Sequence, residues 1–293
     1  MSEKVKPTTF SKKSYVLLTK PGIMMGNAIT LLGGYFLAAR GTFNLILFLA
    51  TVVGLSCLIG SSCVFNNLID RVADAKMERT KKRSMALKSI PRKKIISFAV
   101  ILFVIGTALL VSFTNILAFS VALFGFIVYV ALYSFMKYTS VQGTLVGSLA
   151  GAVPPVVGYA AVKNELDLGA YLLFAILTIW QMPHFYAIAI FRLNDYKAAS
   201  IPVLPLVKGI FTTKVHSLIY AILFLGISPL LTVFGYTGNV YLILSILLSL
   251  GWVLISIQGF SKKTKDVLWA RKSFKYSLIV ITVLSILMMF DYT

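Results

Sequence analysis

Three side chains that can bind a cation recur at every fourth position in one polar segment. Asn66, Asp70 and Asp74 have the spacing that places an amide and two carboxylates along one face of a helix. Carboxylates this close repel one another unless a cation lies between them. A hard divalent ion is the usual occupant, because oxygen ligands suit it and substrate phosphates and water complete its shell. The spacing therefore favours a divalent metal site.

A run of basic residues follows directly. Guanidinium and ammonium groups match phosphate oxygens, so acids followed by bases predict a site for a metal-bound diphosphate. A second interpretation stays open at this point: the acids only solvate a loop at a membrane surface, and the bases set orientation and contact anionic lipid. The basic residues are Lys76, Arg79, Lys81, Lys82 and Arg83.

The second polar region is WQMPHFYAIAIFRLNDYKAASIPVLPLVKG, from Trp180 to Gly209. Pro183 inside a helix frees a backbone carbonyl, which membrane proteins tolerate where neighbours or a cavity satisfy it. His184 is expected about 10 Å from the membrane boundary, at 1.5 Å per residue. A histidine at such a depth is a candidate site residue. A histidine that only hydrogen bonds between helices is the commoner case, and both interpretations stay open.

The elements that must position these residues are transmembrane helices. The 293 residues are 58% hydrophobic and 13% charged, with a mean hydropathy of +0.89, which excludes a pair of soluble domains. We predict an all-α polytopic membrane protein, with nine transmembrane helices bundled around a central cavity that opens on the cytoplasmic side. The apolar runs lie at about 21–39, 43–65, 95–113, 116–136, 144–162, 168–191, 215–234, 239–259 and 274–290.

The net charge of +19 is explained by the lipid bilayer, so no nucleic-acid partner is expected. With the N-terminus in the cytoplasm, only Arg40 and Lys163 fall on the outer side, and the C-terminus lies outside. We expect a cytoplasmic tail over residues 1–20 and one membrane domain over 21–293. Gly143, Gly147 and Gly151 have the spacing of close helix packing, with cavity shaping by the prolines that follow as a second possibility.

These motifs resemble a known family. Asn66-x-x-x-Asp70-x-x-x-Asp74 with the following Arg79-Thr80-x-x-Arg83 is similar to the first aspartate-rich motif of the UbiA-type intramembrane prenyltransferases. NNLIDRVADAKMERTKKR, WQMPHFYAIAIFR and DYKAASIPVLPLVKG resemble segments of the haem-farnesylating members. The resemblance runs from about Lys20 to the last apolar run. It implies an enzyme of the bacterial inner (plasma) membrane that transfers farnesyl from farnesyl diphosphate to a vinyl group of haem B with addition of water, giving haem O and diphosphate.

The resemblance also implies residue roles and Mg²⁺ as cofactor. Ala199 stands where relatives that prenylate phenols commonly carry a second aspartate, which puts a second metal ion in doubt. The implied catalytic and metal-binding residues are Asn66, Asp70, Asp74 and Asp195. The implied diphosphate-binding residues are Lys20, Asn27, Arg79, Arg83, Lys137, Lys197 and Lys208. The haem-binding or cavity residues are Tyr133, His184, Phe185 and Tyr186.

Two other functions remain open on the sequence. A prenyltransferase that acts on a quinone precursor or a chlorin would share the first motif. A secondary transporter would also contain buried carboxylates and broken helices, but its coupling acids lie near the membrane midplane, whereas these acids fall at helix ends. A downstream haem-modifying enzyme is a further expected partner.

Overall fold

The computed structural model describes residues 12–81 and 90–293. Within these ranges nine helical spans are long and apolar enough to cross a membrane, as the sequence predicts. The described residues form no β-strand, and their single β-bridge joins Thr237 to Tyr292. The spans are α2 (Pro21–Ala39), α3 (Leu45–Ile69), α6 (Arg92–Phe113), α7 with η1 and α8 (Ile116–Ile127, Val128–Tyr133 and Ser134–Thr139), α9 with α10 (Gly143–Gly151 and Val153–Lys163), α11 (Leu168–Phe191), α14 with α15 (Gly209–Ile227 and Leu230–Val233), α16 (Asn239–Gln258) and α17 (Asp266–Phe290).

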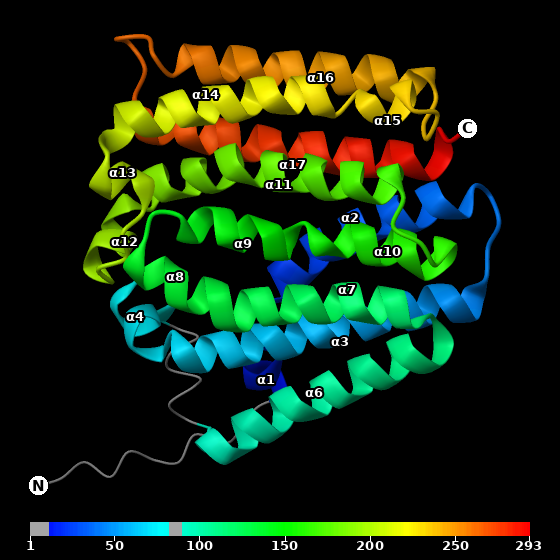
Figure 1. The fold of residues 1–293 in the computed structure, drawn as a ribbon. Helices are drawn as coiled ribbons and strands as arrows, with labels where there is room; N and C mark the ends of the chain where they lie inside the picture. The colour runs from blue at the N-terminus through cyan, green and yellow to red at the C-terminus, as the bar shows by residue number, and fades with distance from the viewer. Residues whose placement is uncertain (1–11, 82–89) are drawn as a thin grey trace, which may run out of the picture.

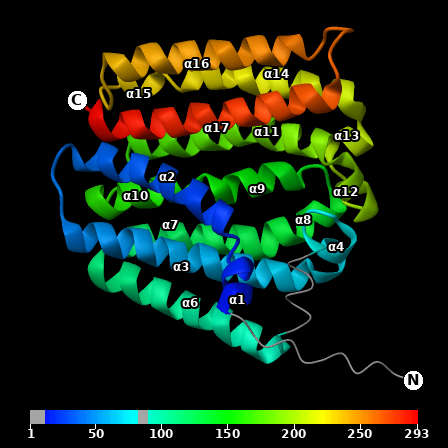
Figure 2. The same ribbon diagram turned by 180° about the vertical axis from the view of Figure 1, so that it is seen from behind.

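The spans lie side by side, and three short helices outside the spans lie together at one end of the bundle (Figure 1). Helix α3 packs on α6, α2 packs on α10, and α11 packs on α14 and α17. Figure 2 shows α2 crossing the back of the molecule between α3 and α17. The three short helices are α4 (Arg71–Lys76), α12 (Leu193–Ala198) and α13 (Leu204–Val207), whereas α1 (Lys12–Leu18) is set in from that end, beside α3 and α6 (Figure 2).

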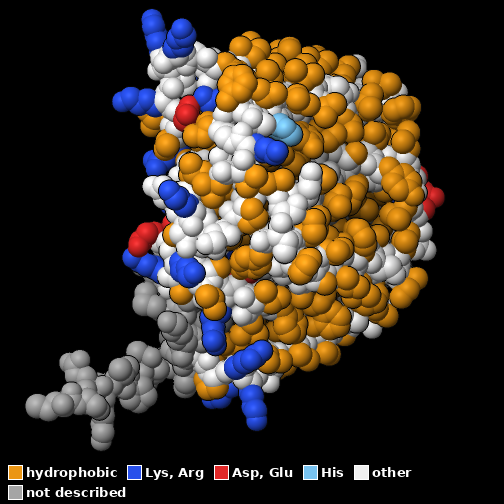
Figure 3. Space-filling view, turned by 60° about the vertical axis from the view of Figure 1, so that its left-hand side comes forward, with side chains coloured by type: hydrophobic (Ala, Val, Ile, Leu, Met, Phe, Trp, Pro, Cys, Tyr) orange, Lys and Arg blue, Asp and Glu red, His pale blue; other side chains and the backbone are white. Residues whose placement is uncertain are grey.

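The two ends of the bundle differ in charge. In the face that Figure 3 shows, Lys and Arg side chains gather at one end, and apolar side chains cover the rest. We call this the basic end, and the other end, where the C-terminus lies, the far end. An apolar outer surface with charge confined to its ends fits a lipid environment, so the chain is an integral, multi-pass membrane protein.

Polar caps fix where three spans begin at the far end. Asn44 accepts a hydrogen bond from the Leu47 amide (3.0 Å) ahead of α3, and Asn115 accepts one from Ala118 (2.8 Å) ahead of α7. Asp167 caps α11 in the same way. Each cap satisfies an amide that the first helical turn leaves without a partner.

Helices α14 and α17 begin earlier than the apolar runs indicate, at Gly209 and Asp266 rather than near residues 215 and 274. The hydropathy of the sequence falls where charged residues occur near the ends of these two spans. The backbone hydrogen bonds of each helix nevertheless continue past those charged residues. Lys214, inside α14, donates to Asp266 Oδ1 and to the Gly259 carbonyl (2.6 Å each), so its buried ammonium group ties three spans together. The expected polar tail also differs, because α1 lies within it and buries Leu18.

Glycines let helices approach closely, as the Gly143, Gly147 and Gly151 spacing predicts. A Cβ on Gly151 would lie 2.0 Å from Gln181 Oε1 of α11, and one on Gly147 would lie 3.0 Å from the Tyr133 ring. The tightest contact with backbone joins α2 and α10, where a Cβ on Gly34 would lie 2.0 Å from the Pro155 carbonyl oxygen.

We expect Gly34→Ala to lower the free energy of unfolding by about 1–3 kcal/mol, because the added methyl must push α10 away from α2. Thermal unfolding in detergent measures it. Gly226→Ala in α14 is the matched control, since nothing lies within 4 Å of the Cβ built there. It should leave stability unchanged or raise it by about 0.5–1 kcal/mol. Equal effects of the two substitutions would contradict the packing argument.

Candidate active site

Asp70 lies where α3 ends and α4 begins, at the basic end. The Asp70 amide donates to the Asn66 carbonyl and the Asp74 amide to the Asp70 carbonyl (2.8 Å each), so the four-residue repeat survives the break between the helices. All three side chains are buried, with 1%, 4% and 2% exposed for Asn66, Asp70 and Asp74. The predicted polar face therefore points into the protein.

Two groups from α8 contact the Asp70 carboxylate. Lys137 forms an ion pair with Oδ2, and Tyr138 donates a hydrogen bond to Oδ1 (2.9 Å). Only 11% of the Lys137 side chain is exposed. Burying a carboxylate or an ammonium group alone is unfavourable, so each of these two charges is stabilised in the interior by the other.

Asn66 is oriented by three neighbours. Its Nδ2 donates to Ser134 Oγ (3.1 Å), and its Oδ1 accepts from Lys20 Nζ (2.6 Å) and the Tyr129 hydroxyl (3.4 Å). Ser134 in turn donates to the Tyr129 carbonyl (3.2 Å). Ser134 therefore fixes the amide so that its carbonyl oxygen faces the Lys20 ammonium.

We expect Ser134→Ala to raise the KM for the allylic diphosphate by about tenfold and to change kcat less. Loss of one buried hydrogen bond that orients Asn66 costs about 1–3 kcal/mol. Steady-state kinetics at saturating acceptor separates the two constants. Ser140→Ala, at the exposed end of α8, is the control and should leave both constants alone. A fall in kcat with an unchanged KM would contradict the orienting role.

Tyrosine rings form one wall of the site. Tyr129 and Tyr133 stack with centroids 5.3 Å apart, and the ammonium groups of Lys20 and Lys137 lie 5.8 and 5.4 Å from these two rings. Both rings come from η1, a π-helical segment, and such segments often mark functional sites. Ring faces of this kind attract cations.

The segment after α4 packs against the segment around α12. Asp195 Oδ1 accepts a hydrogen bond from the Glu78 amide (3.0 Å), and its Oδ2 lies 3.9 Å from Arg192. The Thr80 hydroxyl donates to the Asp74 carbonyl (2.8 Å), which closes the turn that carries Arg79. Asp195 therefore holds this turn in place.

An apolar cluster lies beneath this contact. It contains Ala73 and Met77 from the first acidic segment and Ala199 and Ile201 from the second. Ala199 is 7% exposed, so its methyl group belongs to a packed interior. Burial raises the pKa of the adjacent Tyr196 hydroxyl, Arg79 and Arg192 lower it, and Asp195 raises it. Arg79, Asp195 and Tyr196 thus share one region.

The donor set fits a cation without forming a complete cage. Within residues 12–81 and 90–293 no three His, Cys, Asp or Glu side chains come close enough to hold a metal alone. Asn66 and Asp70 nevertheless present buried oxygen atoms, and ammonium groups already lie against them. Oxygen donors that need further ligands suit Mg²⁺, which keeps several waters and substrate phosphates in its shell.

Not all predicted residues join this cluster. Asn27 is half-buried and Lys197 and Lys208 are exposed, and in the described part of the chain their side chains form no hydrogen bond or ion pair with it. Arg83 lies outside the described residues. Lys20, Lys137, Tyr133, Arg79 and the acids therefore form the assembled part of the predicted site.

His184 lies between α11 and α17. Its Nδ1 is 2.7 Å from Ser277 Oγ, and its ring stacks on Trp180 and packs against Phe274, with centroids 4.8 Å away in each case. The Ser277 hydroxyl donates to the Phe274 carbonyl (2.7 Å), so its oxygen accepts from His184. This arrangement suits the tautomer with its proton on Nδ1, and Nε2 is the ring nitrogen that Ser277 does not contact.

Phe185 and Tyr186 face other neighbours. Phe185 makes an edge contact with His184, at 5.4 Å between ring centroids. Tyr186 packs against His216 and Tyr220 of α14 and against Leu204 of α13. His184, Phe185 and Tyr186, three of the four expected haem-binding or cavity residues, therefore do not form one wall, and Tyr133 lies in the acidic cluster.

Four residues of the site are not among the contacts predicted from the sequence: Tyr129, Ser134, Tyr138 and Tyr196. The four-residue spacing of Tyr129, Tyr133 and Lys137 is a usable signal for one face of the span. The other three contacts depend on how distant segments meet.

Comparisons with known proteins identify relatives along almost the whole chain. The chain is 50% identical over 277 residues to a protoheme IX farnesyltransferase of Protochlamydia amoebophila, covering 94% of this chain and 98% of that one. It is 49% identical to a protein of the same name from Serratia proteamaculans, covering 96% of this chain and 95% of that one.

Solved structures share the fold. A digeranylgeranylglyceryl phosphate synthase superposes with a TM-score of 0.77 at 18% identity, over 95% of this chain and 97% of that one. A UbiA homologue from Archaeoglobus fulgidus, bound to GPP and Mg²⁺, superposes with a TM-score of 0.70 at 13% identity, over 94% of this chain and 99% of that one. The profile of the UbiA prenyltransferase family matches residues 27–279. The chain therefore belongs to the UbiA prenyltransferase family.

Proposed function

We propose that this enzyme transfers the farnesyl group of farnesyl diphosphate to a vinyl group of haem B, with addition of water, to give haem O and diphosphate. The observation that carries the proposal is the buried cluster of Asp70, Lys137, Asn66 and Lys20 at the basic end of an apolar bundle. Such a cluster suits an anionic head attached to a long apolar chain. The farnesyltransferase relatives, at about half identity along the chain, support the haem acceptor.

The lysines act as exchangeable cations. Lys137 lies on Asp70 and Lys20 on Asn66, where the oxygen atoms would otherwise face a metal ion. When the diphosphate enters with Mg²⁺, Asp70, Asp74 and Asn66 would hold the metal, and both ammonium groups would turn to the phosphate oxygens. The same five side chains thus bind the ligand with little exposure of unpaired charge. The Archaeoglobus homologue with GPP and Mg²⁺ supports the metal.

Arg79 would join Lys20 and Lys137 on the diphosphate, since its turn is held by Asp195 and Thr80. Lys197, Lys208, Asn27 and Arg83 remain proposed contacts for the head group. Asp195 remains a proposed metal ligand. When the metal-bound diphosphate enters, the Asp195 carboxylate would exchange its hydrogen bond with the Glu78 amide for a bond to the metal. A single Mg²⁺ is favoured because Ala199 lies in an apolar cluster.

The chemistry follows from where charge develops. The bond between the allylic carbon and the diphosphate oxygen breaks, negative charge grows on the leaving group, and Lys20, Lys137 and Arg79 stabilise it. Mg²⁺ supplies Lewis-acid stabilisation of the same oxygens. The allylic cation lies against the Tyr129 and Tyr133 rings. The vinyl group forms the new carbon–carbon bond, and water adds hydroxyl to the resulting cation and releases one proton.

His184 is the proposed contact for haem. Its Nδ1 proton is held by Ser277, so Nε2 is available to bind the haem iron or to accept a hydrogen bond. Phe185 and Tyr186 are proposed apolar neighbours of the macrocycle. The apolar spans would enclose a cavity for the farnesyl chain that opens at the basic end and excludes water from the cation.

The basic end is proposed to face the cytoplasm, with the enzyme in the bacterial inner membrane. Of the other functions, transport finds no support in a family of prenyltransferases. The alternative within the family is a prenyltransferase that acts on a quinone precursor or a chlorin. Identifying the acceptor that the enzyme prenylates distinguishes this alternative from the haem reaction.

The product tests the proposal. Purified enzyme with Mg²⁺, farnesyl diphosphate and haem B should yield a haem whose mass has risen by one farnesyl group plus one hydroxyl group. Haem B recovered unchanged, together with prenylation of a phenolic or chlorin acceptor under the same conditions, would contradict it.

A further inference from the structure

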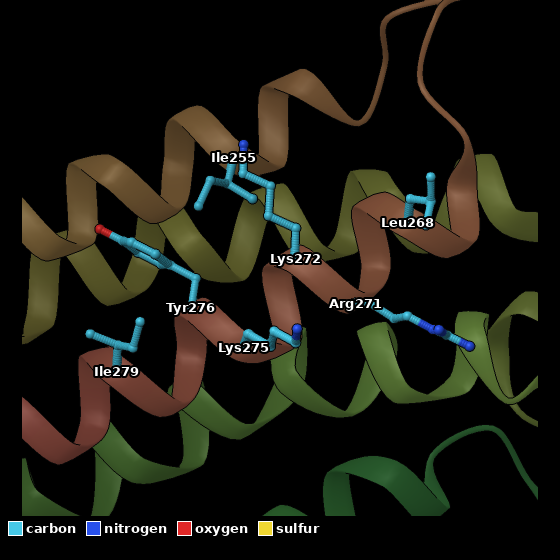
Figure 4. Close-up of a pocket in the computed structure, with 7 residues that line it drawn as sticks. All are labelled: Ile255, Leu268, Arg271, Lys272, Lys275, Tyr276 and Ile279. Carbon is cyan, nitrogen blue, oxygen red and sulfur yellow. The ribbon is translucent and has the colours of Figure 1, made fainter.

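A groove of about 530 Å³ lies on the outside of the bundle between α16 and α17, at the basic end (Figure 4). Its lining joins basic and apolar side chains in one stripe along α17, with one residue from α16. The lining residues are Ile255, Leu268, Arg271, Lys272, Lys275, Tyr276 and Ile279. On α17, Leu268, Lys272 and Tyr276 are spaced by four residues, as are Arg271, Lys275 and Ile279, so they form two adjacent rows along that helix.

The cations of the groove are not neutralised by acids. No lining residue is acidic. Lys272 reaches across to α16, where its ammonium donates to Gln258 Oε1 (2.8 Å), a neutral partner (Figure 4). In the described part of the chain, Arg271 and Lys275 are exposed and form no ion pair. Asp266, the acid nearest along α17, is bound to the buried Lys214 ammonium.

The apolar part of the groove faces the surroundings of the bundle. Leu268 and Ile279 are 61% and 52% exposed, and neighbouring outward residues of α16 such as Leu254 are also apolar. The Tyr276 hydroxyl donates to the Leu248 carbonyl (3.0 Å), so its ring stands as a fixed wall between the helices. Leu268 lies at the start of α17 and Ile279 deeper in the span, so the apolar wall continues past the basic residues into the membrane.

From this charge and apolar complementarity we infer that the α16–α17 groove binds a membrane phospholipid with a net negative headgroup. The headgroup phosphate lies between Arg271 and Lys275, and an acyl chain lies against Tyr276 and Ile279. Basic pockets between spans suit such headgroups, and arginine matches phosphate oxygens in a bidentate manner. This site lies outside the acidic cluster, so it does not depend on which acceptor the enzyme prenylates.

Native mass spectrometry of the purified full chain, titrated with phosphatidylglycerol, tests the site. The wild-type protein should retain phosphatidylglycerol in preference to phosphatidylcholine. Arg271→Gln/Lys275→Gln should weaken phosphatidylglycerol binding about tenfold to thirtyfold. Both basic groups are lost, and each contributes a similar share of the affinity for an anionic lipid. Both side chains are exposed, so the folded state should survive, and thermal unfolding in detergent checks this.

Arg92→Gln/Lys93→Gln is the matched control, because it removes the same charge from exposed positions at the start of α6. It should bind phosphatidylglycerol as the wild type does. Inorganic phosphate in millimolar excess should not displace the lipid, because a free phosphate lacks the apolar contacts. The inference would be overturned if the two double variants weakened binding equally, if phosphatidylcholine were retained as well as phosphatidylglycerol, or if phosphate displaced the lipid. It would also be overturned if Arg271→Gln/Lys275→Gln lost haem B binding while it still retained the lipid.

Discussion

Asp70→Asn should lower kcat for farnesyl transfer at least about a thousandfold. The substitution keeps the shape of the side chain and its capacity to accept the Tyr138 hydrogen bond, but removes the charge that a metal ligand supplies. Loss of a preorganised charge contact to the leaving group has effects of this size in other enzymes. The assay is the rate of haem product formation in detergent. Glu165→Gln, an exposed acid at the far end, is the matched control and should retain full activity.

Stability must be separated from catalysis in this experiment. Asp70→Asn leaves the Lys137 ammonium buried and without its carboxylate, which costs about 3–5 kcal/mol. The double variant Asp70→Asn/Lys137→Met removes both charges and should recover most of the lost stability. It should remain inactive. Recovery of activity along with stability would show that Asp70 acts only as the partner of Lys137.

Removal of divalent metal should abolish turnover. Asp70 and Asp74 are buried, and without a metal their negative charges would face the arriving diphosphate, so the leaving group would lose its strongest stabilisation. EDTA treatment of the purified enzyme, followed by the product assay, measures this effect. Added Mg²⁺ should restore the rate.

A matched experiment excludes damage by the chelator. The unfolding temperature without substrate should not change with EDTA, because Lys137 and Lys20 occupy the cation positions in the absence of ligand. Full turnover in EDTA would rule out metal assistance. A large fall in unfolding temperature would instead indicate a metal built into the fold.

Periodicity and charge in the sequence predict the nine spans and the acidic face. The four-residue repeat of Asn66, Asp70 and Asp74 survives in the structure because backbone hydrogen bonds continue across the break at Asp70. Polar residues at the far end also predict span boundaries, since Asn44 and Asn115 cap the helices that follow them. Local interactions of this kind depend on neighbours in the chain and can be read from it.

Contacts between distant segments could not be predicted in the same way. The Lys137–Asp70 ion pair joins the ends of two spans, and only their packing decides which lysine reaches which acid. The π-helical turn that presents Tyr129 and Tyr133 has no signal in a hydropathy pattern. His184 illustrates the same limit, because the sequence gives its depth but not its Ser277 partner, which fixes the ring nitrogen that remains available.

The departure at Ala199 shows how structure refines a sequence motif. The sequence shows only that a carboxylate is missing from the second acidic segment. In the structure the alanine packs with Ala73, Met77 and Ile201, so the position serves the contact between the two acidic segments. A carboxylate there would have to be buried among apolar side chains, which is unfavourable.

The central claim is that the acidic face holds a cation-bridged diphosphate. Titration calorimetry with farnesyl S-thiolodiphosphate, whose sulfur linkage resists ionisation, tests it without turnover. We predict tight binding to the wild-type enzyme in Mg²⁺, loss of most of that affinity in EDTA, and binding at least about a hundredfold weaker to Asp70→Asn/Lys137→Met. Equal affinity in Mg²⁺ and EDTA, with the double variant binding as the wild type does, would contradict the claim.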